Sequence, residues 1–281
     1  MGEETNKQKM DNYIAKSDTI GGSLFEFEYY EQSDTVTVIK MRKDKEGAIK
    51  IPRFVSNIKI LAWNEECYEC DIYIPEGCRI DMPKNKFEYG ISFYAKSINV
   101  ESKHKEYSSK NGVLYSKDKT QLLAYPRNKK DDKYIVPSSV YIIGDYAFQR
   151  SYILNKIKLS KNLLQIGKND FEKNILFSIN TENEMFKCIN GSLYSKDGNI
   201  LYCLYGRQYN DIKVEEGTVL VKEQSICGRY AKLYLPLSLK YIEKSFMLFS
   251  KNSTFFTEII VSESMRKQLK KYEKGFKITY Y

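Results

Sequence analysis

YIVPSSVYIIGDYAF, at residues 134–148, and IKLSKNLLQIGKNDF, at residues 157–171, share one pattern of apolar positions. The second stretch starts 23 residues after the first, at 157 instead of 134, and the offset holds along its whole length. Val140 matches Leu163, and Phe148 matches Phe171. A fixed period of this size indicates a repeat protein, in which each unit is one small structural element.

The same template, apolar-x-apolar-Pro-x-x-apolar, recurs along the chain and predicts about nine rungs. Clear copies start at Ile49, Tyr134 and Ile157, looser copies at Ile72, Ile212 and Leu233, and degenerate copies at Ile98, Ile179 and Ile259. Each copy begins as a short strand in which alternate residues point inward, as Ile157 and Leu159 do, while Lys158 between them points outward. No unit of this length can bury its own apolar face, so neighbours must stack into a mostly β, α/β repeat solenoid with one parallel sheet.

The phrase N-G-x-L-Y-S-K-D occurs twice, at 111–118 and 190–197, in the two long gaps of the repeat array. Its turn residues stand between apolar runs, which predicts a β-hairpin in each gap. We therefore expect hairpin insertions near 107–130 and 186–208.

The two ends of the array need caps because a terminal rung would expose an apolar edge. Alternating apolar and polar residues near 24–39 predict an antiparallel N-terminal cap. Met265, Leu269 and Tyr272 recur at helical spacing and predict a C-terminal cap helix, with a membrane or partner helix as the alternative. The predicted organisation is a flexible tail at 1–22, then a single solenoid domain at 23–281, with the caps at 23–48 and 263–281 and the rungs at 49–262.

With this template complete, the chain resembles the BspA-like, or Treponema pallidum-type, leucine-rich repeat family. The resemblance covers about 25–281 and is most specific at VPSSVYIIGDYAF, residues 136–148. It implies a right-handed leucine-rich-repeat solenoid, binding rather than catalysis, and a place outside the cell or on the surface of a host-associated bacterium.

Six cysteines are present, and three of them cluster in sequence as Cys67, Cys70 and Cys78. Cys67 and Cys70 have the spacing of a zinc knuckle or a redox pair, but no second such pair supplies a fourth ligand. Cys78 falls in the slot held by Val140 and Leu163, which favours a buried apolar thiol. We expect no metal, and elemental analysis of the purified protein should find well under one zinc per chain.

The sequence offers no set of residues that is expected to converge on one catalytic site. The single histidine, His104, lies in the charged stretch 102–106, which indicates a solvated loop. Carboxylates come as adjacent pairs, such as Asp131 with Asp132, which strand geometry points to opposite faces. No phosphate loop is present. The prediction is a protein that is not an enzyme and has no cofactor.

The formal net charge of +9 favours anionic partners, but the basic residues are scattered and no run resembles a nucleic-acid arm. No stretch reaches eighteen apolar residues, so no transmembrane segment is expected, and no secretory signal is visible in the sequence. We expect a monomer that binds no nucleic acid.

The outward residues of the strands remain as a candidate surface. The predicted ligand-binding residues are Lys50, Tyr73, Asn99, Lys158, Lys213 and Tyr234, accompanied by Ile135, Asn180 and Ile260. Cationic, aromatic and apolar groups in one ladder suit contact with a protein or a glycan; the alternative is a solvated sheet face. The predicted function is adhesion or binding at the cell surface, with an intracellular, cytoplasmic interaction scaffold as the alternative.

Overall fold

The computed structural model describes most of the chain in two compact units. The first comprises Met1–Lys130 and Ile142–Ile153, and the second Asp131–Tyr141 and Leu154–Tyr281. The residues that the structure describes are 17–20, 23–30, 35–42, 48–53, 55–58, 70–84, 90–93, 95–168, 175–228, 230–244, 258–273 and 277–281. For the segments from 17 to 42, only the backbone is described.

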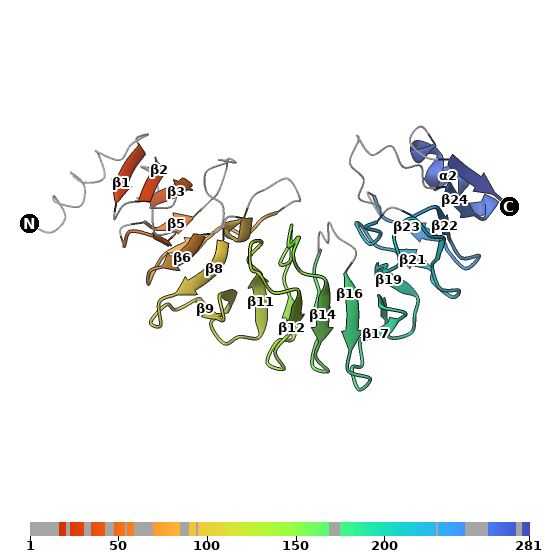
Figure 1. Ribbon diagram of the computed structural model, residues 1–281, viewed down its shortest axis with the longest axis horizontal. Helices are drawn as coiled ribbons and strands as arrows, with labels where there is room; N and C mark the ends of the chain where they lie inside the picture. Colours follow the sequence, from red (N-terminus) through yellow and green to blue (C-terminus); the bar gives the residue numbers. More distant parts are fainter. Residues whose placement is uncertain are drawn as a thin grey trace, which may run out of the picture. The chain divides into compact units, whose positions relative to one another are not determined.

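The first unit opens with an antiparallel cap (Figure 1). In the rungs that follow, successive strands belong in turn to two parallel ladders. The cap strands are β1(Ser17–Ile20), β2(Ser23–Tyr30) and β3(Thr35–Arg42). One ladder holds β4(Ala48–Lys50), β6(Cys70–Ile74) and β8(Ala95–Val100), and the other continues from β3 through β5(Asn57–Ile58) and β7(Arg79–Ile80). The antiparallel cap is confirmed, and Ser17–Ile20 pairs with β2 although it falls in the segment expected to be a tail.

An insertion and one further short strand complete this unit. The 3-10 helix η1(Ile91–Phe93) precedes β8, and the insertion is formed by β9(Tyr107–Lys110), β10(Val113–Ser116) and β11(Gln121–Ala124). The strand β13(Ile142–Ile143) pairs with β11 in parallel.

The second unit repeats this plan and closes with a cap that contains a short helix. Two parallel ladders carry its outward residues. One consists of β12(Lys133–Ile135), β14(Lys156–Leu159) and β16(Leu176–Ile179), and the other of β20(Ile212–Lys213), β22(Lys232–Tyr234), β24(Glu258–Val261) and β25(Lys277–Tyr280). Its remaining elements are β15(Gln165–Ile166), β17(Phe186–Ile189), β18(Ser192–Ser195), β19(Ile200–Cys203), β21(Leu220–Val221), β23(Tyr241–Ile242), η2(Glu263–Met265), α2(Arg266–Leu269) and η3(Lys270–Tyr272). The predicted cap helix is confirmed, with Met265 and Leu269 buried.

The strand register confirms the repeat. Ile49 pairs with Ile72 and Ile72 with Ile98, and all three side chains are buried in one apolar core. In the second unit, Ile212, Leu233 and Ile259 are aligned in the same way within a separate core. The fold is therefore a mostly β solenoid of stacked rungs with very little helix.

A turn closes the strand of each rung and explains the Pro-x-x-apolar part of the template. The carbonyl of Pro75 accepts the N–H of Cys78, and Pro137 and Val140 repeat this bond. The apolar residue at the end of the turn enters the core, because Cys78 and Val140 are fully buried. The prediction of a buried thiol at Cys78 is confirmed.

One rung lies two residues from its expected place. Phe177, rather than Ile179, is aligned with Ile157, so Ser178 takes the outward position that the sequence suggested for Asn180. Asn180 instead begins the turn after the strand, where its carbonyl accepts the N–H of Asn183. The prediction for Asn180 is wrong, and the offset of 79 residues from Ile98 to Phe177 matches that between the duplicated phrases.

The insertions are three-stranded antiparallel meanders, so each contains two hairpins. Asn111 and Gly112 form the two-residue loop between β9 and β10, with φ of 51° and 76°. Asn190 and Gly191 repeat this loop with φ of 51° and 84°. Both central residues have positive φ, as a type I′ turn requires. The predicted hairpins are confirmed, and the Asn-Gly pair adds a turn beyond the one expected at Ser-Lys-Asp.

The insertions also divide the parallel sheet. The N–H of Ile98 on β8 donates to the carbonyl of Gly112, 2.8 Å away, and Phe177 on β16 donates to Gly191 at 2.9 Å. The hairpin loop thus binds the edge to which a next strand would otherwise add. The expected single sheet is consequently present as three ladders of three, three and four strands among the described residues.

Candidate functional site

Three of the predicted binding residues lie side by side on the outward face of the first unit. Lys50 on β4 is aligned with Tyr73 on β6, which is aligned with Asn99 on β8. The ring of Tyr73 is 44% exposed, and Lys50 is exposed as well. Parallel pairing therefore brings a cation, an aromatic ring and an amide from three separate rungs into one row.

This row lines a hollow of about 480 Å³ at the carboxyl ends of the three strands. Ile51, Ile74 and Pro75 contribute apolar lining, and all three are largely withdrawn from solvent. Arg53 and Glu101 supply its charged groups beside Lys50. The hollow thus combines apolar lining residues with polar and charged ones, as binding sites for ligands do.

The polar groups of the hollow are mostly engaged within the protein. Glu101 accepts a hydrogen bond from the N–H of Glu76 at 2.8 Å on one oxygen and forms an ion pair with Arg53 on the other. The Glu76 N–H, followed by the Arg53 guanidinium, holds the pKa of the Glu101 carboxyl below its usual range. The Asn99 amide donates to Ser97 Oγ at 2.8 Å, and Ser97 donates to Asp71.

The Lys50 ammonium and the Tyr73 hydroxyl remain unused. Among the described residues, no hydrogen bond or ion pair engages either group. The hollow therefore presents a cation and an aromatic ring, whereas the carboxylate of Glu101 is paired with Arg53.

The remaining predicted residues lie in the second unit and are arranged differently. Lys213 and Tyr234 are aligned neighbours, with the ammonium 5.3 Å from the centre of the ring. The Tyr234 hydroxyl donates to Asp211 Oδ2 at 3.4 Å. Lys158 is exposed in a different ladder, beside Ile135 and Ser178. The Lys213 ammonium thus interacts with the Tyr234 ring, whereas the Lys50 ammonium makes no such contact among the described residues.

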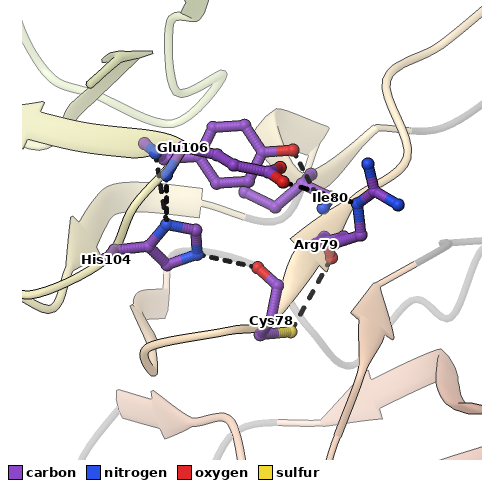
Figure 2. A network of polar contacts seen from close by, with 6 residues as sticks. Cys78, Arg79, Ile80, His104 and Glu106 are labelled. Atoms are coloured by element: carbon purple, nitrogen blue, oxygen red, sulfur yellow. Dashed lines mark hydrogen bonds and ion pairs between the residues drawn. The ribbon is translucent and has the colours of Figure 1, made fainter. Parts of the chain in front are cut away.

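His104 is buried in the turn after β8, which contradicts its prediction as a solvated loop residue. The side chain is 2% exposed, with Nε2 2.9 Å from the carbonyl oxygen of Cys78 (Figure 2). Its Nδ1 accepts the N–H groups of Glu106 and Tyr107 at 3.1 and 3.2 Å. Nδ1 is therefore unprotonated and Nε2 carries the hydrogen that Cys78 accepts.

The reason for the burial of His104 is its position in the turn. Its N–H donates to the carbonyl of Glu101, as Cys78 donates to Pro75, so its side chain enters the slot that is apolar in other rungs. The sequence prediction did not include Arg53 and Glu101, which line the hollow, and it missed the burial of His104. The spacing of three residues from Glu101 to His104 is the signal that could have found the histidine.

The duplicated phrase is used for structure. Ser116 Oγ accepts the N–H of Gln121 and Ser195 Oγ that of Ile200, each at 2.9 Å. The ammonium groups of Lys117 and Lys196 donate to the carbonyls of Ser102 and Thr181. These bonds recur in both copies, so the Ser-Lys part of the phrase has the same structural role in each.

The cysteines of the described segments are free thiols. Cys70, Cys78, Cys203 and Cys227 are buried, and Cys188 is partly buried. Burial raises the pKa of the Cys78 thiol to about 12. Cys67 lies outside the described residues. Where the structure describes the chain, no group of three His, Cys, Asp or Glu side chains is placed to hold a metal ion.

Residues 127–215 match the family model described as BspA type leucine rich repeat region, in six copies. The resemblance predicted at 136–148 is thereby confirmed: this chain carries a BspA-type leucine-rich repeat region. No helix in the described parts has the length and hydropathy to cross a membrane. No curated protein matches the chain.

Three solved structures are similar to this chain. The pneumococcal vaccine antigen PcpA is 14% identical, with a TM-score of 0.38, over 95% of this chain and 97% of that chain. A leucine rich cell surface protein from Faecalibacterium prausnitzii is 17% identical, with a TM-score of 0.41, over 73% and 60%. A leucine-rich repeat protein from Eubacterium ventriosum is 17% identical, with a TM-score of 0.38, over 74% and 78%.

Proposed function

We propose that this chain is a non-enzymatic binding protein that presents the outward faces of its parallel ladders to a protein or glycan partner. The observation that supports this most directly is the alignment of Lys50, Tyr73 and Asn99 along one hollow. Aromatic and cationic side chains at the centre of a surface are typical anchors of protein interfaces. The BspA-type repeats support the same role, with adhesion at the surface of a host-associated bacterium as its setting.

The binding test is a screen of the purified chain against extracellular-matrix proteins and a glycan array. Two variants separate the faces, Lys50→Glu/Tyr73→Ala in the first unit and Lys158→Glu/Lys213→Glu/Tyr234→Ala in the second. The matched control is Lys240→Glu, which reverses an exposed charge on the other side of a rung. Loss of binding in a face variant but not in the control supports the proposal, and unchanged binding in both face variants contradicts it.

A second experiment separates the surface role from an intracellular scaffold. Protease treatment of intact cells should digest the protein if it is displayed outside, while a cytoplasmic marker survives. Protection of the chain in intact cells, with digestion after lysis, would favour the intracellular alternative.

A further inference from the structure

We propose that the hollow of the first unit binds a peptide segment that carries a carboxylate next to an apolar side chain. This inference rests on the proposed binding function and names the chemistry of its ligand. In it, the carboxylate pairs with the Lys50 ammonium, and the apolar side chain packs on the ring of Tyr73 and enters the lining formed by Ile51, Ile74 and Pro75.

Charge complementarity favours an acidic partner. Arg53 forms an ion pair with Glu101, and the Lys96 ammonium lies 3.7 Å from the Asp71 carboxylate. The charges of these acidic and basic groups therefore largely cancel. Lys50 is left as the unpaired cation of the hollow among the described residues. A net charge of +9 attracts an acidic segment over longer distances as well.

The state of the polar groups favours a peptide over a glycan. Sugar hydroxyls need free donors and acceptors, but both Glu101 oxygens are occupied and the Asn99 amide group donates to Ser97. The groups that remain are the Lys50 ammonium, the Tyr73 phenol, the Asn99 amide oxygen and an apolar lining, which offer few hydrogen bonds to several sugar hydroxyls. An acidic residue beside a leucine or an aromatic residue fits that combination.

The dimensions of the site limit the length of the segment. Lys50 and Asn99 lie two strands apart, which is about 9–10 Å in a parallel sheet. An extended chain advances about 3.3 Å per residue, so roughly three residues cross the hollow. The carboxylate and the apolar side chain therefore belong to the same or neighbouring residues.

The test uses the full chain and three sets of hexapeptides. The first set places Asp or Glu beside Leu, Phe or Trp between Gly and Ser residues, with acetylated and amidated ends. The second set replaces the acid with Asn or Gln. The third set is neutral but ends in a free carboxylate beside the apolar residue, which separates a side-chain carboxylate from a terminal one. Affinities are measured by titration at low and at 0.5 M salt.

We expect acidic peptides to bind at least about fivefold more tightly than their amide counterparts, and this preference to weaken at high salt. Lys50→Glu should abolish the preference for acid, and Tyr73→Ser should weaken all peptides that bind. Lys240→Glu, which reverses an exposed charge outside the predicted binding residues, should change nothing. Equal melting temperatures would show that Lys50→Glu and Tyr73→Ser remain folded, as expected for exposed side chains.

Four results would overturn the proposal. They are equal binding of acidic and amide peptides, a preference for acid that survives Lys50→Glu, binding in the hollow by glycans alone, and the absence of peptide binding in every set. None of these results contradicts the proposed function if an intact protein or glycan still binds through a ladder face in the screen described above. Failure of that screen with every partner is a separate outcome and removes the proposed function itself.

Discussion

His104 and Asn183 occupy the same position in their respective rungs, 79 residues apart, and share three equivalent hydrogen bonds. Asn183 Nδ2 donates to the carbonyl of Leu163 at 2.8 Å, as His104 Nε2 does to Cys78. Asn183 Oδ1 accepts the N–H groups of Met185 and Phe186, at 2.9 and 2.7 Å, as His104 Nδ1 accepts those of the corresponding pair. A polar residue at the turn position that is apolar in other rungs thus connects each insertion to the preceding rung by hydrogen bonds.

Replacing His104 with Ala should destabilise the protein strongly. The change leaves the Cys78 carbonyl and the N–H groups of Glu106 and Tyr107 without their partner. We expect the free energy of unfolding to fall by about 2–4 kcal/mol, measured by denaturant unfolding.

His104→Asn is the matched rescue, because asparagine makes these bonds at position 183. We expect this variant to recover at least half of the lost stability. An Asn variant as unstable as the Ala variant would show that packing of the ring on Tyr107, at 4.8 Å between centroids, matters more than the hydrogen bonds.

Gly112 and Gly191 should tolerate no side chain. Both have positive φ, and a Cβ at Gly112 would lie 2.7 Å from Ser97 Cβ, while one at Gly191 would lie 2.4 Å from Leu176 Cδ1. Gly112→Ala should lower the free energy of unfolding by about 2 kcal/mol or more.

The control for this change is Gly77→Ala, because Gly77 has φ of +86° but no atom within 4 Å of the added Cβ. It should cost only about 1 kcal/mol, the price of the left-handed backbone. Equal costs at the two positions would mean that the close approach to Ser97 is relieved by a small shift.

The buried thiols should react slowly in the native protein. Burial raises the pKa of Cys78 and Cys203 to about 12, so almost no thiolate is present at neutral pH. Alkylation by N-ethylmaleimide at pH 7.5, mapped by mass spectrometry, should leave both unmodified until denaturant is added. Rapid native modification of Cys78 would mean that its rung opens readily.

The ladder could be predicted from sequence because its signal is local. The inward and outward positions at Ile157 and Lys158 follow from alternation within one strand, and the period then extends them to other rungs. The degenerate rung at Phe177 was misplaced because Ile179 also fits an apolar strand position. The offset of the duplicated phrase would have corrected it.

The residues of the hollow could be predicted only in part, and the burial of His104 was not predicted. Lys50, Tyr73 and Asn99 follow from the register, but the pairing of Arg53 with Glu101 joins residues 48 positions apart and leaves no trace in either neighbourhood. His104 was misread because its immediate neighbours are charged. Lys103 and Lys105 are exposed as those neighbours suggest, while the turn directs the histidine inward.

Strand, turn, fastening residue and hairpin all recur at the same offset of 79 residues, from Ile98 to Phe177, His104 to Asn183 and Gly112 to Gly191. One copying event of a 79-residue block accounts for both insertions more simply than separate gains would. Recombination between such blocks would exchange whole blocks in register. Relatives that arose in this way would differ in length by steps of 79 residues, whereas slippage between simple rungs would change the length by 23.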